Sequence, residues 1–206
     1  MSAVEELTKA IELDSNFASA YYYRGCALNK GFASDGMDTI TRDFEKCIAL
    51  APDSNFWEAY FYLASLVYEY YDDEKALAYY NKAIYSNPTN YILYCQRGYL
   101  RERMRNIDGA MDDYYKSISL NNKAYQALYN KYHLEETLGN LKEALITINQ
   151  LLSFEKQDAN IYFDKAFILC ELGQKKNAQD AFEIYNRLKD PKIQRFELDE
   201  NACKVK

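Results

Sequence analysis

One segment of this chain returns after 34 residues, and that interval limits what the chain can fold into. The segment DEKALAYYNKAIYSNPTN, residues 73–90, reappears as IDGAMDDYYKSISLNNKA, residues 107–124. The matched pairs are Ala76 with Ala110, Tyr80 with Tyr114, and Ile84 with Ile118. A fixed period of this length is typical of chains in which small, similar structural units stack on one another.

The same spacing extends along the chain when units are counted from Trp57, Tyr91, Tyr125 and Ala159. Position 4 of each unit is bulky, positions 8, 20 and 27 are mostly small, and position 24 is large. Position 8 is Ala64, Gly98, Tyr132 and Ala166, and position 24 is Tyr80, Tyr114, Ile148 and Phe182. Upstream, residues 18–56 form one more unit if about three extra residues lie in a loop within residues 29–38, where insertions cost little. Residues 2–17 match the second half of a unit.

These residues resemble the tetratricopeptide repeat, whose unit is two antiparallel helices with a large residue at position 4, small ones at 8, 20 and 27, and Pro at 32. Only Pro52 and Pro88 supply that proline. The resemblance implies an all-α fold, a right-handed α-solenoid of antiparallel helix pairs that spans residues 1–192 as one domain. Its expected parts are a half repeat at 2–17 and repeats at about 18–56, 57–90, 91–124, 125–158 and 159–192.

The pattern also has a physical reason that is independent of the family. Small residues where two helices cross allow close approach, bulky neighbours fill the gaps, and one pair alone cannot bury its apolar face. The unit at 125–158 carries Tyr132 at a normally small position and Glu135 at a normally apolar one. We expect this unit to be a local weak point, because stability in such arrays is a sum of neighbouring interfaces.

The two ends depart from the repeat. The chain begins at a second helix, which suggests a piece of a longer array or an unusual N-terminal cap. After Pro191 the segment 193–206 leaves the pattern and carries Ile193, Phe196 and Leu198. We expect it to cap the last helix pair, with a place in a groove as the alternative.

Composition restricts the ligand classes. The net charge of -6 and pI near 5.0 disfavour binding to nucleic acid or to an anionic membrane surface. No apolar stretch is long and uncharged enough to predict membrane insertion. The five cysteines are scattered without metal-type spacing and predict neither a disulfide framework nor a zinc site, so we expect reduced thiols and a cytoplasmic location.

In the family that the sequence resembles, positions 2, 5, 9 and 12 of the first helix line the concave side. In this chain those positions are rich in aromatic residues, so we expect a partner-binding groove there. The candidate groove residues are Tyr22, Phe61, Tyr68, Tyr99, Arg103, Tyr129, His133, Phe163 and Phe167. Tyrosine suits recognition because it buries a large, stiff surface and keeps a hydroxyl. The alternative is that the 21 tyrosines reflect a composition bias and the repeat core.

Two further features leave alternatives open. Arg97, Arg101, Arg103 and Arg105 form the densest basic stretch, which could dock an acidic or phosphorylated peptide or could be a solvated face paired with Glu102 and nearby acids. His133 is the only histidine and could donate a hydrogen bond to a groove ligand. It cannot build a metal or nucleophilic site alone.

No Gly-rich phosphate loop, metal spacing or nucleophile motif is present, so we predict no enzyme activity, no cofactor and no metal. The residues that grip chaperone C-termini in one branch of the resembled family are also missing. The predicted function is a protein-protein interaction scaffold that binds a partner peptide or helix. The alternatives are a structural spacer in a longer solenoid, with self-association through its ends, or the recruiting arm of a larger enzyme complex.

Overall fold

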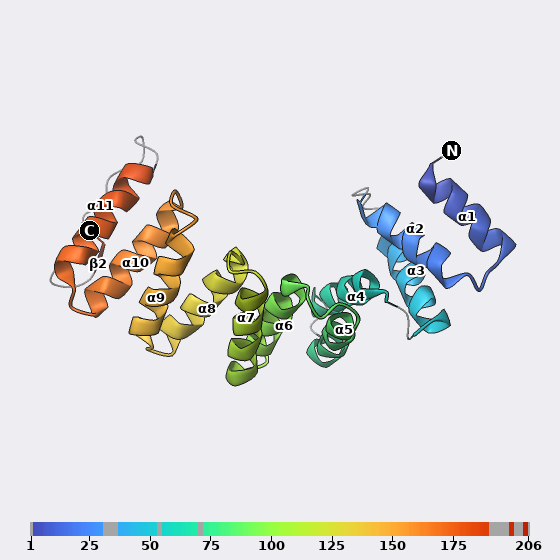
Figure 1. Ribbon diagram of the computed structural model, residues 1–206, viewed down its shortest axis with the longest axis horizontal. Coiled ribbons are helices and arrows are strands. Elements are labelled where there is room, and N and C mark those ends of the chain that lie inside the picture. The colour runs from blue at the N-terminus through green and yellow to red at the C-terminus, as the bar shows by residue number, and fades with distance from the viewer. Residues whose placement is uncertain are drawn as a thin grey trace. The chain divides into compact units, whose positions relative to one another are not determined.

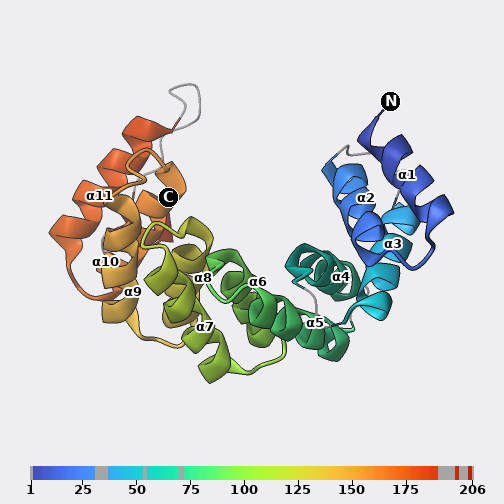
Figure 2. The ribbon, with the colours of Figure 1, turned by 45° about the vertical axis from the view of Figure 1, so that its right-hand side comes forward.

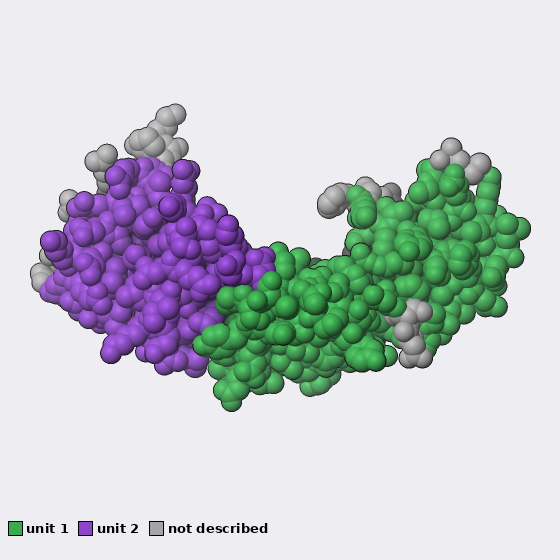
Figure 3. Space-filling model, viewed as in Figure 1, with its two compact units in different colours: residues 1–120 green, residues 121–206 purple. Residues whose placement is uncertain are grey.

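The computed structural model describes residues 2–30, 37–52, 55–69, 72–189, 198–199 and 204–205, and the chain divides into two compact units (Figure 3). Unit 1 spans residues 1–120 and unit 2 spans residues 121–206. The described helices of unit 1 are α1 (Ala3–Leu13), α2 (Ala18–Lys30), α3 (Met37–Leu50), α4 (Trp57–Glu69), α5 (Asp73–Ser86), α6 (Tyr91–Arg103) and α7 (Ile107–Leu120). Those of unit 2 are α8 (Tyr125–Thr137), α9 (Leu141–Leu152), α10 (Ala159–Glu171) and α11 (Lys175–Leu188).

Within each unit, consecutive helices form hairpins (Figure 1, Figure 2). In unit 1, α2 packs on α3, α4 on α5, and α6 on α7, while α3–α4 and α5–α6 contacts join one hairpin to the next. In unit 2, α8 packs on α9 and α10 on α11, and α9 contacts α10. The prediction of an all-α fold of helix pairs is confirmed.

Glycine allows the close crossing of paired helices at position 8. A Cβ atom added to Gly98 in α6 would lie 2.8 Å from Cε1 of Tyr114 in α7. A Cβ atom on Gly25 in α2 would lie 2.7 Å from Cε1 of Phe44 in α3. Both distances are shorter than real carbon contacts allow, so the large ring of the second helix occupies the space that the small residue of the first helix leaves.

Tyrosine at position 4 has a structural role in three places. The hydroxyls of Tyr60 and Tyr94 donate to the carbonyl oxygens of Pro52 and Pro88, each at 3.0 Å. Tyr21 donates in the same way to the carbonyl of Ser15 at 3.2 Å. These bonds tie the start of a first helix to the loop before it and satisfy a backbone acceptor that the turn leaves open.

The turn between paired helices requires a left-handed residue at position 15. Gly139 and Gly173 adopt φ values of +76° and +74° there, which glycine does at no steric cost. In the α6–α7 turn the equivalent residue is Arg105, at φ +62°. A side chain in this region costs about 1 kcal/mol, so this turn is less favourable than its two counterparts.

The structure accommodates the two unusual side chains of the α8–α9 pair. Tyr132 is fully buried, and its hydroxyl donates to Oδ2 of Asp164 at 2.6 Å. Glu135 is also buried, and it accepts from Nζ of Lys131 at 2.6 Å and from Oγ1 of Thr147 at 2.7 Å. Because both polar groups are bonded, neither carries the full penalty of an unsatisfied buried group. The expected local weakness of this unit stays a prediction.

The cysteines differ in state. Cys26, Cys47 and Cys95 carry free thiols, whereas Cys170 is disulfide-bonded. The prediction of reduced cysteines throughout is therefore wrong for Cys170. Burial raises the pKa of both Cys47 and Cys95 to about 12, so these thiols stay protonated at neutral pH and act as small apolar core residues.

Two sequence predictions fall largely outside the described residues. The insertion assigned to residues 29–38 lies mostly in the undescribed segment 31–36. Of the terminal segment 193–206, the structure describes β1 (Leu198–Asp199) and β2 (Lys204–Val205), which pair antiparallel with Leu198 opposite Val205. The proposed capping role of this segment stays a prediction.

Candidate functional site

Unit 1 contains a cavity of about 360 Å³ between the first helices of its repeats. Its lining comes mainly from α2, α4 and the start of α6, with one ring from α3. The lining residues are Cys26, Asn29, Lys30, Phe44, Trp57, Glu58, Phe61, Tyr62, Ser65, Asn90 and Ile92. We call this cavity the unit 1 pocket.

Helical spacing explains why these side chains converge. Glu58, Phe61 and Ser65 follow one another at intervals of three and four residues, so they share one face of α4. On α2, Asn29 and Lys30 lie three and four residues after Cys26. Phe61 is half-buried and its ring centroid lies 6.1 Å from that of Tyr80, so the packed second helix holds it in place.

The pocket combines an apolar wall with a few polar groups. Burial raises the pKa of Glu58 and that of the Cys26 thiol. The hydroxyl of Tyr62 is buried and has no hydrogen-bond partner among the described residues. An unpartnered buried hydroxyl costs about 1–3 kcal/mol. A ligand that supplied an acceptor to Tyr62 would therefore gain stability from a group that is already in place.

Other aromatic residues predicted for the unit 1 groove lie outside this pocket's lining. Tyr22 is only 8% exposed, and its ring stacks on Phe56 with 4.7 Å between centroids. Tyr22 is a core residue and does not offer a contact surface to a ligand. Tyr68 and Tyr99 lie together with 6.0 Å between ring centroids, and Tyr99 is 47% exposed.

Arg103 belongs to this second aromatic group and is already paired. Its guanidinium carbon lies 3.5 Å from the centroid of the Tyr68 ring, a cation–π contact. It also donates to both carboxylate oxygens of Asp73 and to the carbonyl oxygen of Tyr68. The arginine therefore fixes the C-terminal end of α6 against α4 and the start of α5.

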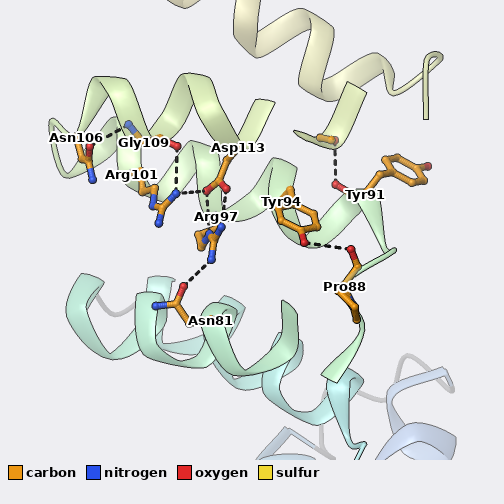
Figure 4. Close-up of polar contacts among 10 residues, drawn as sticks. Asn81, Pro88, Tyr91, Tyr94, Arg97, Arg101, Asn106, Gly109 and Asp113 are labelled. Carbon is orange, nitrogen blue, oxygen red and sulfur yellow. Dashed lines mark hydrogen bonds and ion pairs between the residues drawn. The ribbon is translucent and has the colours of Figure 1, made fainter. Parts of the chain in front are cut away.

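Arg97 and Arg101 are also engaged within the fold (Figure 4). Arg97 donates from Nε at 2.8 Å and from Nη2 at 2.6 Å to the two carboxylate oxygens of Asp113. Arg101 donates from Nη1 to Asp113 at 2.8 Å. Glu102 instead accepts from the hydroxyl of Tyr114 at 2.8 Å. Much of the basic stretch thus pairs with acids of neighbouring helices, not with Glu102.

Unit 2 presents a cluster of aromatic rings and carboxylates at α8 and α10. Tyr129 lies 4.5 Å from His133 and 5.2 Å from Tyr132, centroid to centroid. Tyr125 donates from its hydroxyl to Asp158 at 2.7 Å, as Tyr132 does to Asp164. Burial raises the pKa of both tyrosines, and the neighbouring carboxylates raise it further. His133 Nδ1 lies 3.4 Å from Glu136 Oε2.

The two phenylalanines predicted for the groove in unit 2 are half-buried. Phe163 packs at the edge of the α10–α11 core, with ring centroids 5.2 Å from Tyr185 and 6.2 Å from Phe182. Phe167 is on the same helix one turn later. The residues predicted to line one groove therefore form separate groups in the two units, and some of them belong to the core.

Sequence reasoning missed Trp57, Tyr62 and Lys30 in unit 1, and the carboxylates of Asp158 and Asp164 in unit 2. Tyr62 and Asp164 both occupy position 6 of their units, next to position 5, which was included. Including position 6 of each first helix among the groove positions would have found both residues. The described His, Cys, Asp and Glu side chains include no group of three or more that could hold a metal ion.

A family model described as "Tetratricopeptide repeat" matches residues 91–123, which cover the α6–α7 pair. Anaphase-promoting complex subunit 3 of Schizosaccharomyces pombe is 24% identical over 182 residues, covering 88% of this chain and 27% of that protein. A TPR repeat-containing protein of Methanocaldococcus jannaschii is 24% identical over 196 residues, covering 88% of this chain and 33% of that protein.

This chain contains a match to the tetratricopeptide repeat family in its α6–α7 pair, and both relatives are similar to it over 88% of its length. It spans a third or less of the length of these two relatives. The solved structure of YrrB, "a TPR protein with an unusual peptide-binding site", matches with a TM-score of 0.75 at 17% identity, over 92% of this chain and 94% of YrrB. This match confirms the tetratricopeptide solenoid as the fold class. Among the described helices, none has both the length and the apolar character needed to cross a membrane.

Proposed function

We propose that this chain is a non-catalytic scaffold that binds an extended or helical segment of a partner protein in the unit 1 pocket. Protein interaction is the role that the repeat family supports. The observation that carries the finer proposal is the pocket itself, where Phe61 and Ile92 offer apolar surface beside the unpartnered hydroxyl of Tyr62. Apolar walls with a few fixed polar groups are typical of ligand sites.

Two further observations favour a peptide over a small metabolite. The pocket lies between first helices of successive repeats, so a longer chain could continue along the same face of α4 toward Tyr68 and Tyr99. The solved relative YrrB is described as having a peptide-binding site, so this fold is compatible with that function. The expected affinity is micromolar, about -8 kcal/mol, because a few anchoring side chains must offset the ordering of the peptide.

Peptides selected from a random library against the intact chain, with binding measured by fluorescence anisotropy, test the proposal. Ile92 lines the pocket and is 42% exposed, so Ile92→Gln removes apolar contact without disturbing the core. Ile146 on α9 is 68% exposed and lies outside the pocket, which makes Ile146→Gln the matched control. We expect Ile92→Gln to weaken binding roughly tenfold, from about 1.4 kcal/mol of lost burial.

The hydroxyl is tested separately with Tyr62→Phe, which keeps the ring and removes the unpartnered donor. The expected loss is a few-fold in affinity, the scale of one neutral hydrogen bond. If the affinity is the same in Ile92→Gln, Tyr62→Phe and Ile146→Gln, the unit 1 pocket is not the binding site. If no peptide is selected at all, a structural role as a spacer is favoured instead.

A further inference from the structure

A cation that is largely buried recurs at the same place in three helix pairs. It stands at position 7 of the first helix and meets position 23 of the second. Arg24 pairs with Asp43 at 2.7 Å and Arg97 with Asp113 at 2.6 Å. In the α8–α9 pair, Lys131 donates to Thr147 at position 23 and to Glu135, at 2.7 Å and 2.6 Å.

The arginines also reach back to position 25 of the preceding second helix. Arg24 donates from Nη1 to Oγ1 of Thr8 at 3.2 Å. Arg97 donates from Nη1 to Oδ1 of Asn81 at 2.7 Å (Figure 4). The carboxylate at position 23 and the polar group at position 25 both accept hydrogen bonds from the cation. They thereby replace part of the hydration that the cation loses on burial.

The α10–α11 pair keeps the cation and lacks the acid. Lys165 occupies position 7, but position 23 is Ala181. Lys165 is half-buried and has no hydrogen bond or ion pair within the described part of the chain. Burial lowers its pKa, which is the response expected of an ammonium group that lacks a compensating anion.

A cavity of about 340 Å³ lies where the acid is missing. Lys165 and Ala181 line it, and Asn149, at position 25 of the preceding second helix, lines it as well. Asn177 adds a second amide. The first turn of α11 carries no acidic side chain, and its N-cap, Gln174, makes no side-chain cap bond, so the positive end of this helix dipole is not neutralised from within.

We propose that this cavity binds a carboxylate side chain from an acidic segment of a partner protein, in the place that Asp43 and Asp113 take in their own helix pairs. The site lies within unit 2 and is independent of the unit 1 pocket. A singly charged carboxylate matches the one ammonium group of Lys165. Asp180, an exposed residue that also lines the cavity, disfavours a doubly charged phosphate.

The test uses the full chain at low salt and a fluorescein-labelled, end-capped hexaglutamate peptide, with anisotropy as the readout. Lys165→Met keeps the length of the side chain and removes the charge, and we expect it to weaken binding roughly tenfold or more, the scale of a charge-assisted bond. Lys176→Gln removes an exposed charge of α11 that does not line the cavity. We expect it to change the affinity by less than about twofold, as for an exposed charge.

A second variant restores the missing acid from inside. Ala181→Asp should pair with Lys165 as Asp113 pairs with Arg97, block the peptide, and leave the helical circular dichroism spectrum unchanged. If that variant fails to fold, the comparison of Lys165→Met with Lys176→Gln still tests whether Lys165 binds the peptide. Competition by acetate and by inorganic phosphate shows whether the cavity binds a carboxylate or a phosphate.

Three results would overturn the proposal. The first is equal peptide affinity in Lys165→Met and the wild-type chain. The second is an equal loss in Lys165→Met and Lys176→Gln, which would indicate a diffuse basic surface. The third is displacement of the peptide by phosphate at concentrations far below those of acetate, which would indicate a phosphate site. If Ile92→Gln and Tyr62→Phe leave peptide binding to the unit 1 pocket unchanged, the proposed function is wrong. The hexaglutamate result with Lys165→Met stands independently, because Lys165 lies in unit 2.

Discussion

The α6–α7 and α8–α9 pairs fill equivalent repeat positions with opposite choices of side-chain size. At positions 8 and 24, α6–α7 uses Gly98 under the large ring of Tyr114. The α8–α9 pair places the large ring first, as Tyr132, and a smaller residue second, as Ile148; both are fully buried. The total volume at the crossing is balanced in both pairs, although the residue types are exchanged, as close packing requires.

The same two pairs also neutralise a largely buried cation differently. In α6–α7 one carboxylate, Asp113, serves two arginines. In α8–α9 the lysine at position 7 shares its bonds between Glu135, on its own helix, and Thr147. The comparison teaches that a repeat position specifies a volume or a charge balance, which different residue types can supply.

The largest difference between the pairs should appear on removal of the acid. Asp113→Ala leaves two guanidinium groups without their carboxylate, and we expect a loss of about 3–5 kcal/mol in the free energy of unfolding. Glu135→Ala should cost less, because Lys131 keeps its bond to Thr147 and an ammonium group can lose its proton, whereas guanidinium cannot. Urea unfolding followed by circular dichroism at 222 nm measures both. Equal losses in the two variants would show that the two networks are energetically alike.

The next effect concerns the helix crossing. Gly98→Ala adds a Cβ atom 2.8 Å from the Tyr114 ring and 3.2 Å from Cβ of Asp113. We expect it to destabilise by about 1–3 kcal/mol, despite the better helix propensity of alanine. Adding Tyr114→Ile, the residue type found at this position in α9, should recover part of that loss.

Gly109→Ala is the matched control for this crossing. The added atom would meet the exposed Asn106 side chain, whose Oδ1 accepts from the Gly109 backbone N–H at 3.0 Å, so we expect at most the loss of this cap bond, about 0.5–1 kcal/mol. A Gly98→Ala variant as stable as the wild type would mean that the helices separate without cost. The tight crossing would then not be the reason for glycine at position 8.

The period and the small–large pattern were sufficient to predict the helix pairs, because both are properties of the sequence that any close-packed hairpin must satisfy. Position 4 tyrosines could be recognised as core residues, but their hydroxyl bonds to Pro52, Pro88 and Ser15 could not be seen. Those bonds give part of the tyrosine content a structural reason. The aromatic count alone was therefore a weak guide to binding residues.

The site was predicted less well, because helical position alone does not give depth. Phe61 lines the unit 1 pocket, whereas Tyr22, at the same position of the preceding repeat, is buried against Phe56. Arg103 was expected at the groove edge, but Asp73, 30 residues earlier, pairs with it. Contacts between residues far apart in the sequence decide such cases, and the repeat pattern does not encode them.

The smallest of the three effects comes from the hydroxyl of Tyr132. Burial raises the pKa of Asp164, and the bond from Tyr132 opposes that rise. Tyr132→Phe should therefore raise the Asp164 pKa further and destabilise unit 2 by about 1–2 kcal/mol at pH 7.

This effect should depend on pH. A carboxyl group with a raised pKa in the folded state favours folding below its ordinary pKa, and it loses that contribution as the pH rises through the folded-state pKa. The deficit of Tyr132→Phe should thus be largest at neutral pH and shrink as the pH falls through the folded-state pKa of Asp164, because a protonated carboxyl group has less need of the hydroxyl bond. Urea unfolding at pH 7 and pH 4 measures this difference, with Tyr85→Phe as the control because Tyr85 is 89% exposed. A deficit that is the same at both values of pH would show that the charge of Asp164 makes no contribution to it.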